Sequence, residues 1–340
     1  MDLNFAIVLF LISAAIIAVA GTMLAKVADQ LADLTGMGEA LFGAIFLGSA
    51  TSLPGIITSV VAAADGHAEL AISNAIGGIA AQTFFLSIAD LSYPRANLEH
   101  AAASFPNLMQ GVLLVALLSF VLLGMSTPPV TIFAVNPISI LMLIVYVAGS
   151  RKISNARLRP MWRPRHTTHT VKDEPNPNYL KKLSLSNVAI RFIILVVAVG
   201  GAGFAVAKSG IAIVAQTALS ESFVGAIFTA VATSLPELIV SIALVRQRAL
   251  TLAVGNIIGG NTFDVLFIAF ADVAYRDGSI LHAISNSQVL IIALTLLMTS
   301  TLILGLLIRE KKGIGKIGWE SFLVILLYLA GNVTLYFMGE

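Results

Sequence analysis

Long apolar stretches recur along the whole chain and constrain its fold more than any other feature. Each runs for about 20 residues, which is enough for an α-helix to cross a hydrocarbon core about 30 Å thick. The chain is 58% hydrophobic and 11% charged, whereas a soluble domain carries about 25% charged residues. The sequence therefore predicts an all-α polytopic membrane protein. Ten transmembrane helices are predicted, at residues 5–26, 38–63, 68–92, 108–126, 131–150, 187–208, 220–245, 250–274, 288–308 and 317–338.

One polar stretch, from Arg151 to Asn187, separates the fifth predicted span from the sixth. It is rich in Arg, Lys and Pro, a composition typical of a solvated linker. No basic residue precedes the first apolar run, so we interpret the N-terminal segment as the first span and not as a signal peptide. These features divide the chain into a first helical unit (1–150), a basic linker (151–186) and a second helical unit (187–340).

The distribution of basic residues predicts the orientation in the membrane. If the linker is cytoplasmic, the loops on that side carry all but three of the 20 Lys and Arg residues. Lys208 and Arg276 lie on the opposite side, and Arg191 lies just inside the sixth span. Cytoplasmic loops of membrane proteins are enriched in Lys and Arg. We therefore predict a cytoplasmic linker and both termini outside, in a bacterial inner (cell) membrane.

The two helical units share sequence, and every matched pair is separated by the same distance along the chain. The pairs include Thr51-Ser-Leu-Pro54 with Thr233-Ser-Leu-Pro236, Ile76-Gly-Gly78 with Ile258-Gly-Gly260, and His100 with His282. Each unit has five predicted spans, an odd number, so the second copy must cross the membrane in the opposite orientation. Inverted repeats are typical of secondary transporters, whose substrate site lies near the midplane where the copies meet. The alternative is a duplication that was retained for folding alone.

Both copies place the sequence Thr-Ser-Leu-Pro inside a span. Proline lacks an N–H and clashes with the carbonyl four residues earlier, so Pro54 and Pro236 are each predicted to free a backbone carbonyl. A bound cation is one partner for such a carbonyl inside a membrane. Hydroxyl oxygens suited to Na⁺ or Ca²⁺ flank each proline: those of Thr51, Ser52, Thr233 and Ser234. The alternative is a helix kink in which the Thr and Ser side chains bond to the backbone.

Two carboxylates lie within the second copy. Glu237 follows the proline directly, inside an apolar span, and Asp264 lies in the next span, three residues after Asn261. Residues three apart share one face of a helix, and a carboxylate inside a membrane is costly enough to indicate function. Glu237, Asn261 and Asp264 are therefore predicted to form an oxygen cage with a charge of about −2. The alternative is a pair of protonated, structural carboxyl groups.

These motifs resemble a known family. Thr233-Ser-Leu-Pro-Glu237, followed by Gly255-Asn-Ile-Ile-Gly-Gly-Asn-Thr-Phe-Asp264, is similar to the second signature repeat of the calcium/cation antiporter superfamily, and most similar to its sodium/calcium exchangers. The resemblance implies antiport by alternating access, in which Na⁺ or H⁺ runs down its gradient to expel Ca²⁺. It also implies that Glu237 and Asp264 bind the metal ion (Ca²⁺ or Na⁺), with Thr233, Ser234 and Asn261 beside them.

The first repeat departs from this pattern. Gly55 stands opposite Glu237, and Gln82 stands opposite Asp264; we expect the amide oxygen of Gln82 to serve as a substitute ligand. Because affinity for a divalent ion follows ligand charge, the loss should weaken Ca²⁺ more than Na⁺, K⁺ or H⁺. Three possibilities remain: an antiporter limited to monovalent cations, a weak calcium exchanger, and a non-transporting sensor or scaffold. For a transporter, we expect Glu237→Gln to abolish flux and Gly55→Glu to raise calcium affinity.

Other classes of function receive no support from the sequence. It contains no cysteine, phosphate loop, zinc motif or nucleophile elbow, so we expect neither an enzyme nor a bound cofactor. The expected partners are inorganic cations (Ca²⁺ or Na⁺, with H⁺ or K⁺) and the lipid bilayer; nucleic acid is not expected, and no protein partner is indicated. Asp90 and Asp272 end matched spans, and we expect solvated helix ends there, with a vestibule lining as the alternative.

Overall fold

The structure, a computed structural model, describes residues 1–35, 49–91, 97–158, 162, 164, 184–311 and 318–339. Helices dominate this part of the chain, and its only β-type pairing is an isolated bridge between Ile132 and Val135. The all-α prediction is therefore confirmed for the described residues. In chain order the elements are α1 (Leu3–Ile16), the π-helix η1 (Ile17–Gly21), α2 (Thr22–Thr35), α4 (Leu53–Ala64), α5 (Ala68–Leu91), α6 (Leu98–Ala102), α7 (Phe105–Ser126), α8 (Pro137–Leu158), α10 (Leu185–Gln216), α11 (Glu221–Phe223), the π-helix η2 (Val224–Thr229), α12 (Ala230–Thr233), α13 (Leu235–Arg246), α14 (Leu250–Asp264), α15 (Leu266–Ala274), the 3₁₀-helix η3 (Ile280–His282), α16 (Asn286–Ile308) and α17 (Trp319–Met338).

Eight helices among the described residues are long and apolar enough to cross a membrane. A ninth span results if the bent pair Glu221–Thr233 and Leu235–Arg246 is counted as one. The remaining predicted span, 38–63, begins in residues 36–48, which lie outside the described residues, as does most of the predicted linker 151–186. The length and apolarity of the described helices are those of an integral membrane protein.

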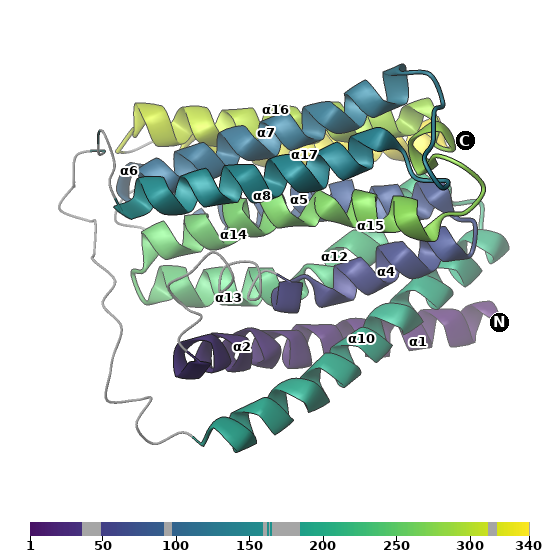
Figure 1. Cartoon of the computed structure of the whole chain (residues 1–340), viewed down its shortest axis with the longest axis horizontal. Helices are drawn as coiled ribbons and strands as arrows, with labels where there is room; N and C mark the ends of the chain where they lie inside the picture. The colour runs from purple at the N-terminus through teal and green to yellow at the C-terminus, as the bar shows by residue number, and fades with distance from the viewer. Residues whose placement is uncertain are drawn as a thin grey trace.

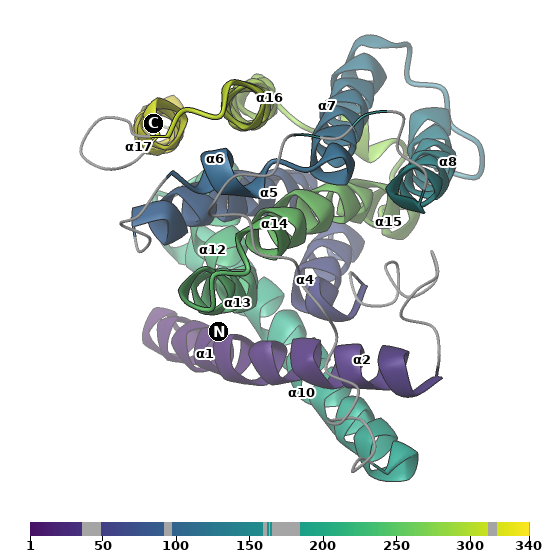
Figure 2. The same cartoon turned by 90° about the vertical axis from the view of Figure 1, so that its left-hand side faces the viewer.

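The described helices form one bundle around central helices (Figures 1 and 2). In α5, 89% of the most apolar 18-residue window is buried, and in the α14–α15 span 72% is buried. The corresponding share is half or less in the other long helices. Figure 2 shows α16 and α17 on one flank, α7 and α8 on another, and α1, α2 and α10 across the opposite side. The central helices α5 and α14 are therefore those best placed to hold polar groups away from lipid.

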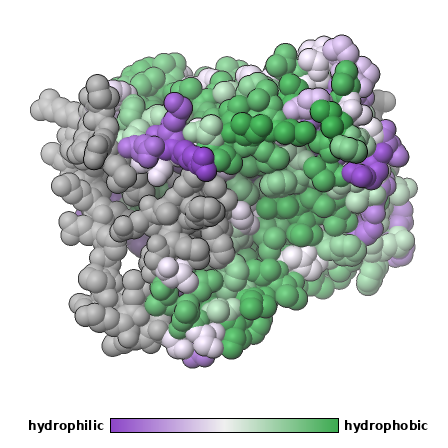
Figure 3. All heavy atoms as spheres, viewed as in Figure 1, coloured by the Kyte–Doolittle hydropathy of each residue, from purple (hydrophilic) through white to green (hydrophobic). Residues whose placement is uncertain are grey.

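Large apolar side chains cover the outside of this bundle. Leu11, Val197 and Leu326 are 61%, 69% and 53% exposed, and Figure 3 shows apolar residues over the middle of the molecule with hydrophilic residues towards its two ends. A soluble monomer rarely exposes a continuous apolar surface of this extent. The belt is the surface expected of helices that face hydrocarbon.

Asp90 and Asp272 are not the solvated helix ends that the sequence predicted. They are only 1% and 0% exposed. Each carboxylate instead accepts a hydrogen bond from a backbone N–H further along the chain: Leu98 N donates to Asp90 at 2.8 Å and Ile280 N to Asp272 at 2.9 Å. The expectation is wrong because the chain turns back at each of these points and covers the carboxylate. The two contacts occupy matched positions of the two units and lie at opposite ends of the bundle (Figure 1).

Candidate cation site

Two helices break near the centre of the bundle, each just before a proline. α4 begins at Leu53 with Pro54 in its first turn, and α13 begins at Leu235 with Pro236 in its first turn. Proline is tolerated in the first turn of a helix, where its missing N–H has no helical partner in any case. The helix pair that meets at Ser234 is bent by 49°. A helix therefore breaks just before each proline, while the release of a backbone carbonyl at these points stays a prediction.

A small cavity lies between these two breaks. Its walls come from α4, α5, α12–α13 and α14–α15. The lining residues are Ser52, Gly55, Asn74, Gly78, Gln82, Thr233, Ser234, Glu237, Asp264 and Phe267. Six of the eight residues predicted from sequence as cation ligands are thus brought together here, from positions up to 212 residues apart.

Asp264 is held by donors from the first half of the chain. Ser52 Oγ donates to Asp264 Oδ1 at 2.5 Å, and Gln82 Nε2 donates to Asp264 Oδ2 at 2.6 Å. Gln82 Nε2 also lies 3.4 Å from Ser234 Oγ. Hydrogen bonds to a carboxylate are short and about twice as strong as neutral ones. The Asp264 carboxylate is therefore a fixed point that joins the two halves at the cavity.

Several oxygens around this cavity lack a hydrogen-bond partner among the described residues: Glu237 Oε2, Gln82 Oε1 and Asn74 Oδ1. The amide orientations are set by their nitrogens, because Gln82 Nε2 binds Asp264 and Asn74 Nδ2 donates to Gly55 O at 3.2 Å. All three unsatisfied atoms are acceptors, and a buried acceptor without a partner costs about 1–3 kcal/mol. A cation or a donated proton is the kind of partner that satisfies all of them.

Two predicted ligands do not line the cavity. Asn261 Nδ2 donates to Thr83 Oγ1 at 3.1 Å and to Ile79 O at 3.4 Å, so the amide is turned towards α5. Its Oδ1 has no hydrogen-bond partner among the described residues. Thr51 is half-buried beside the first break and is absent from the cavity wall. Their role as ligands stays a prediction.

Four lining residues are not among the ligands predicted from the sequence. Asn74 and Gly78 belong to a segment that recurs in the second unit, so its repetition was a usable signal. Gly55 stands opposite Glu237 in the repeat and Phe267 opposite Phe85, but neither match indicated that the two would meet: a Cβ added at Gly55 would lie 2.5 Å from Phe267 Cε2. The aromatic ring of the second half thus fills the space that a side chain at position 55 would need.

The charge in this cavity comes from two carboxylates, Glu237 and Asp264, which are 6% and 2% exposed. Among the described residues, no three His, Cys, Asp or Glu side chains are grouped so that they could hold a metal ion. An ion here would therefore be held by two carboxylates with amide and hydroxyl oxygens. These ligands are all oxygens, which Na⁺ and Ca²⁺ prefer. Two carboxylates give the site little negative charge for binding a divalent ion.

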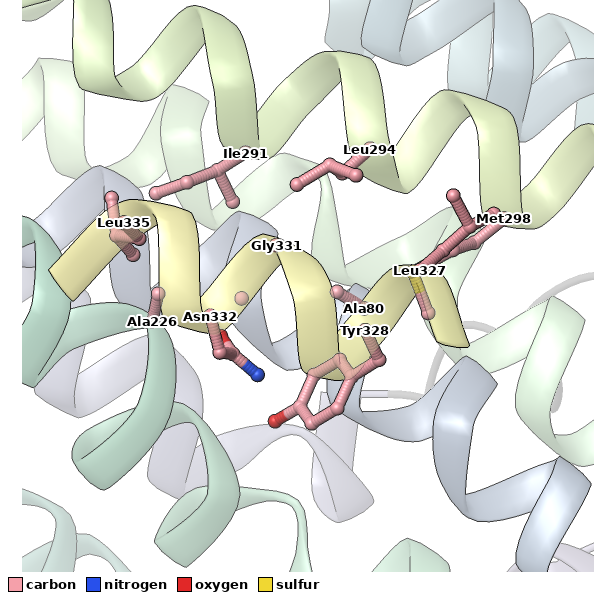
Figure 4. A pocket seen from close by; sticks show the side chains of 11 residues that line it. Ala80, Ala226, Ile291, Leu294, Met298, Leu327, Tyr328, Gly331, Asn332 and Leu335 are labelled. Atoms are coloured by element: carbon pink, nitrogen blue, oxygen red, sulfur yellow. The ribbon is translucent and has the colours of Figure 1, made fainter. Parts of the chain in front are cut away.

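A second cavity, between α16, α17 and the central helices, has a different character (Figure 4). Its side chains are apolar except for Tyr328 and Asn332. It contains no carboxylate and offers no cage for an ion. The cavity at the helix breaks is the candidate site.

Sequence comparison places the chain in a family. The family model described as "Sodium/calcium exchanger protein" matches residues 5–149 and 187–337. The chain belongs to this family. Among curated relatives of this exchanger-family chain, the sodium/calcium exchanger MaX1 of Methanosarcina acetivorans is 26% identical over 121 residues, which are 35% of this chain and 32% of the relative. The match thus spans about a third of that relative's length.

Solved structures share the fold of the exchanger-family chain. The sodium-calcium exchanger NCX_Mj has a TM-score of 0.60 at 19% identity and covers 98% of this chain and 100% of its own. The H⁺/Ca²⁺ exchanger CAX has a TM-score of 0.69 at 15% identity, over 98% and 85% of the two chains. YfkE has a TM-score of 0.60 at 15% identity, over 98% and 97%. At these identities the likeness establishes the fold.

Proposed function

We propose that this exchanger-family chain is a secondary active cation antiporter that binds its cation between the two helix breaks. The observation that carries the proposal is the set of buried, unpaired acceptor oxygens on Glu237, Gln82 and Asn74 around one cavity. A cation is the ligand that satisfies acceptors of this kind without a donor from the protein. Glu237 and Asp264 supply the negative charge, and Ser52, Gln82, Thr233 and Ser234 supply neutral oxygens.

The proposal includes ten spans arranged as two inverted five-helix repeats, in units 1–150 and 187–340 joined by a cytoplasmic linker at 151–186. Two observations support it: the cavity takes residues from both units, and the contacts of Asp90 and Asp272 repeat at opposite ends of the bundle. Relative movement of the two units would open the cavity to each side in turn. The Ser52–Asp264 and Gln82–Asp264 hydrogen bonds cross between the units and would be strained or broken in that movement.

The excess of Lys and Arg in the loops on one side supports an orientation with both termini outside the cell. We propose the bacterial inner (cell) membrane as the location.

Calcium antiport is the first candidate for this chain, because MaX1 and NCX_Mj are sodium/calcium exchangers and CAX is an H⁺/Ca²⁺ exchanger. A second candidate, antiport of monovalent cations alone, is favoured by one specific observation. The first unit contributes no carboxylate to the cavity wall, where Glu237 and Asp264 are the two acids, and Phe267 fills the space beside Gly55. Fewer anionic ligands weaken a divalent ion more than a monovalent one.

Uptake into proteoliposomes tests the proposal. Radioactive Na⁺ and Ca²⁺ would be followed under imposed Na⁺, Ca²⁺ and pH gradients for the natural chain, for Glu237→Gln and for Asp277→Asn, a control at an exposed acid. We expect gradient-driven flux in the natural chain and in Asp277→Asn, and none in Glu237→Gln. Flux that survives Glu237→Gln would refute the proposed site. Absence of any flux in the folded natural chain would support the sensor or scaffold alternative.

A further inference from the structure

A second group of buried carboxyls lies far from the cation site, at the α6 end of the bundle. It consists of Asp90 at the end of α5, Glu99 on α6 and Glu320 in the first turn of α17. Their exposed fractions are 1%, 1% and 0%. Asp90 and Glu99 belong to the first half of the chain and Glu320 to the second, so the group joins the two halves at this end.

The opposite end of the molecule provides an internal comparison. Asp272 corresponds to Asp90 and makes the matching contacts: Asn136 N donates to Asp272 Oδ2 at 2.7 Å, as Gly318 N does to Asp90 Oδ2 at 3.4 Å. The positions that match Glu99 and Glu320 in the other unit, however, hold the apolar residues Leu281 and Ile138. The two additional carboxyls therefore exist at one end only, and the fold does not require them.

Two glycines leave room for the Glu320 side chain. A Cβ added at Gly305 would lie 2.5 Å from Glu320 Cγ, and one added at Gly318 would lie 2.6 Å from Glu320 Cδ. Neither oxygen of Glu320 has a hydrogen-bond partner among the described residues, and Glu99 Oε2 also lacks one. Glu99 Oε1 accepts a hydrogen bond from Ser321 Oγ at 3.2 Å. Two fully buried carboxyls thus lie beside one another with three unsatisfied oxygens.

Ionised carboxylates are acceptors only, so they cannot satisfy one another. One added proton changes this, because a protonated carboxyl donates to its neighbour and also removes a buried charge. Burial raises the pKa of Glu99 well above its usual range, and the charges of Asp90 and Glu320 raise it further.

The other charged and titratable groups around the pair, among the described residues, are Asp90 on α5, His100 on α6, and Arg309, Glu310 and the exposed Lys311 after α16, whose backbone oxygen accepts a hydrogen bond from Asn97 N at 3.3 Å. Arg309 and His100 bind each other's backbone. Arg309 Nη2 donates to His100 O at 2.9 Å, and His100 Nδ1 lies 2.7 Å from Arg309 O. These contacts direct both side chains to backbone carbonyls beside the carboxyl group.

We propose that Glu99 and Glu320, beside Asp90, form a proton-binding site, separate from the cation cavity, that fastens α17 to α5 and α6 when it is protonated. The bound proton lies between the two glutamate carboxyls. Its loss leaves adjacent negative charges in a buried space and loosens this junction between the halves. The ligand is a proton, and the effect is a pH-dependent stability at one end of the bundle.

The sign of the pH dependence follows from linkage. The folded protein binds this proton more tightly than the unfolded chain does, so the stabilisation is full at low pH and is lost as the pH rises through the folded-state pKa. Glu99→Gln and Glu320→Gln mimic the protonated form and should flatten this dependence. The double variant Glu99→Leu, Glu320→Ile copies the residues of the opposite end and should remove it.

The test uses the whole chain in nanodiscs and two readouts. Infrared spectra between pH 6 and pH 9 report the carbonyl band of protonated carboxyls, and thermal unfolding reports stability at the same pH values. We expect the natural chain to lose band intensity as the pH rises and to melt about 2–4 °C lower at the alkaline end relative to Glu99→Gln. Asp277→Asn, at an exposed acid after α15, should behave as the natural chain does, and Glu237→Gln should keep the intensity that depends on Glu99.

Three results would overturn the proposal. The first is an equal loss of carbonyl band intensity between pH 6 and pH 9 in the natural chain, in Glu99→Gln and in Glu320→Gln. The second is an unchanged pH dependence of melting in the variants that fold. The third is stabilisation by added Ca²⁺ that requires Glu320, which would indicate a metal site. If the glutamine variants fail to fold, a natural chain whose infrared spectrum shows no titrating protonated carboxyl refutes the proposal by itself.

Discussion

The two helix breaks have the same backbone arrangement and different chemistry. At each break a serine precedes a helix that carries proline in its first turn, with φ and ψ of −85° and 0° at Ser52 and −97° and 5° at Ser234. The residue after the proline is Gly55 in the first half and Glu237 in the second. Both halves thus share the proline-dependent break, but only the second half carries a charged residue after the proline.

The two halves of the chain therefore contribute different kinds of group to the site. The second half supplies both carboxylates, and the first half supplies Ser52 and Gln82, which hold Asp264 by hydrogen bonds. The second half also supplies the ring of Phe267, which fills the space beside Gly55. Two helix breaks of similar backbone geometry can therefore carry an asymmetric site, and the variants below test that asymmetry.

Asp264→Asn should have the largest effect. It removes one of two charges and places an amide where both carboxylate oxygens now accept hydrogen bonds, so at least one donor loses its partner, at about 1–3 kcal/mol. We expect cation flux in proteoliposomes to vanish and the melting temperature to fall. Asp277→Asn, at an exposed acid, should change neither. Retained flux in Asp264→Asn would show that the second half does not carry the essential charge.

Ser52→Ala tests the supporting part of the first half. The variant deletes one hydrogen bond to a buried carboxylate, an interaction worth about 1.5–3 kcal/mol. We expect cation affinity, measured by calorimetric titration, to fall by about 10- to 100-fold, with flux reduced and still detectable. Ser119→Ala is a matched control, since Ser119 Oγ is exposed and donates to its own helix at Val115 O. An unchanged affinity in Ser52→Ala would mean that the hydrogen bond to Asp264 does not position the ligand.

Gly55→Glu tests whether the first half can simply regain its carboxylate. The sequence suggested that this change would raise calcium affinity, but the geometry contradicts so simple an outcome. Its Cβ would lie 2.5 Å from the Phe267 ring, and overpacking of a buried site costs about 1–3 kcal/mol. We now expect a destabilised protein with no gain in Ca²⁺ binding, as measured by thermal unfolding with and without Ca²⁺. A gain in calcium affinity without loss of stability would show that Phe267 does not occupy this space.

The smallest expected effect comes from relieving that clash. Gly55→Glu combined with Phe267→Ala adds a carboxylate and makes room for it. We expect Ca²⁺ affinity at least about tenfold higher, or about 1.4 kcal/mol, than in Phe267→Ala alone, with a smaller change for Na⁺. Equal Ca²⁺ affinities in the two variants would show that the residue at position 55 does not determine ion preference.

The framework of the fold could be predicted from sequence because it depends on local signals. Apolar length predicted the helices, proline predicted the breaks at Ser52 and Ser234, and the constant offset between the repeats predicted that Glu237 and Asp264 would meet residues of the first half. The segment 36–48 and most of the linker lie outside the described residues, so the predictions for them stay predictions.

Contacts between distant side chains could not be predicted in the same way. The ring of Phe267 lies against Gly55 from the other half of the chain, and nothing in either local sequence indicates it. Asn261 shares a helix with Asp264 at a spacing that predicts one face, yet its amide donates to Thr83 and does not line the cavity. Glu99 and Glu320 lie in different halves of the chain, and they are neighbours because α17 packs beside α5 and α6. Spacing along one helix is local, whereas burial and pairing depend on the whole bundle.

Anomalous diffraction from crystals soaked with a heavy cation would locate a cation bound between the two helix breaks. Thallium(I) can stand in for a monovalent ion and strontium for calcium. We expect an anomalous peak in the cavity, bounded by Glu237 Oε2 and Gln82 Oε1 and beside Asp264, that is lost in Glu237→Gln crystals. A peak elsewhere in the bundle, or an empty cavity at saturating ion with Glu237 turned to lipid or to a basic side chain, would contradict it.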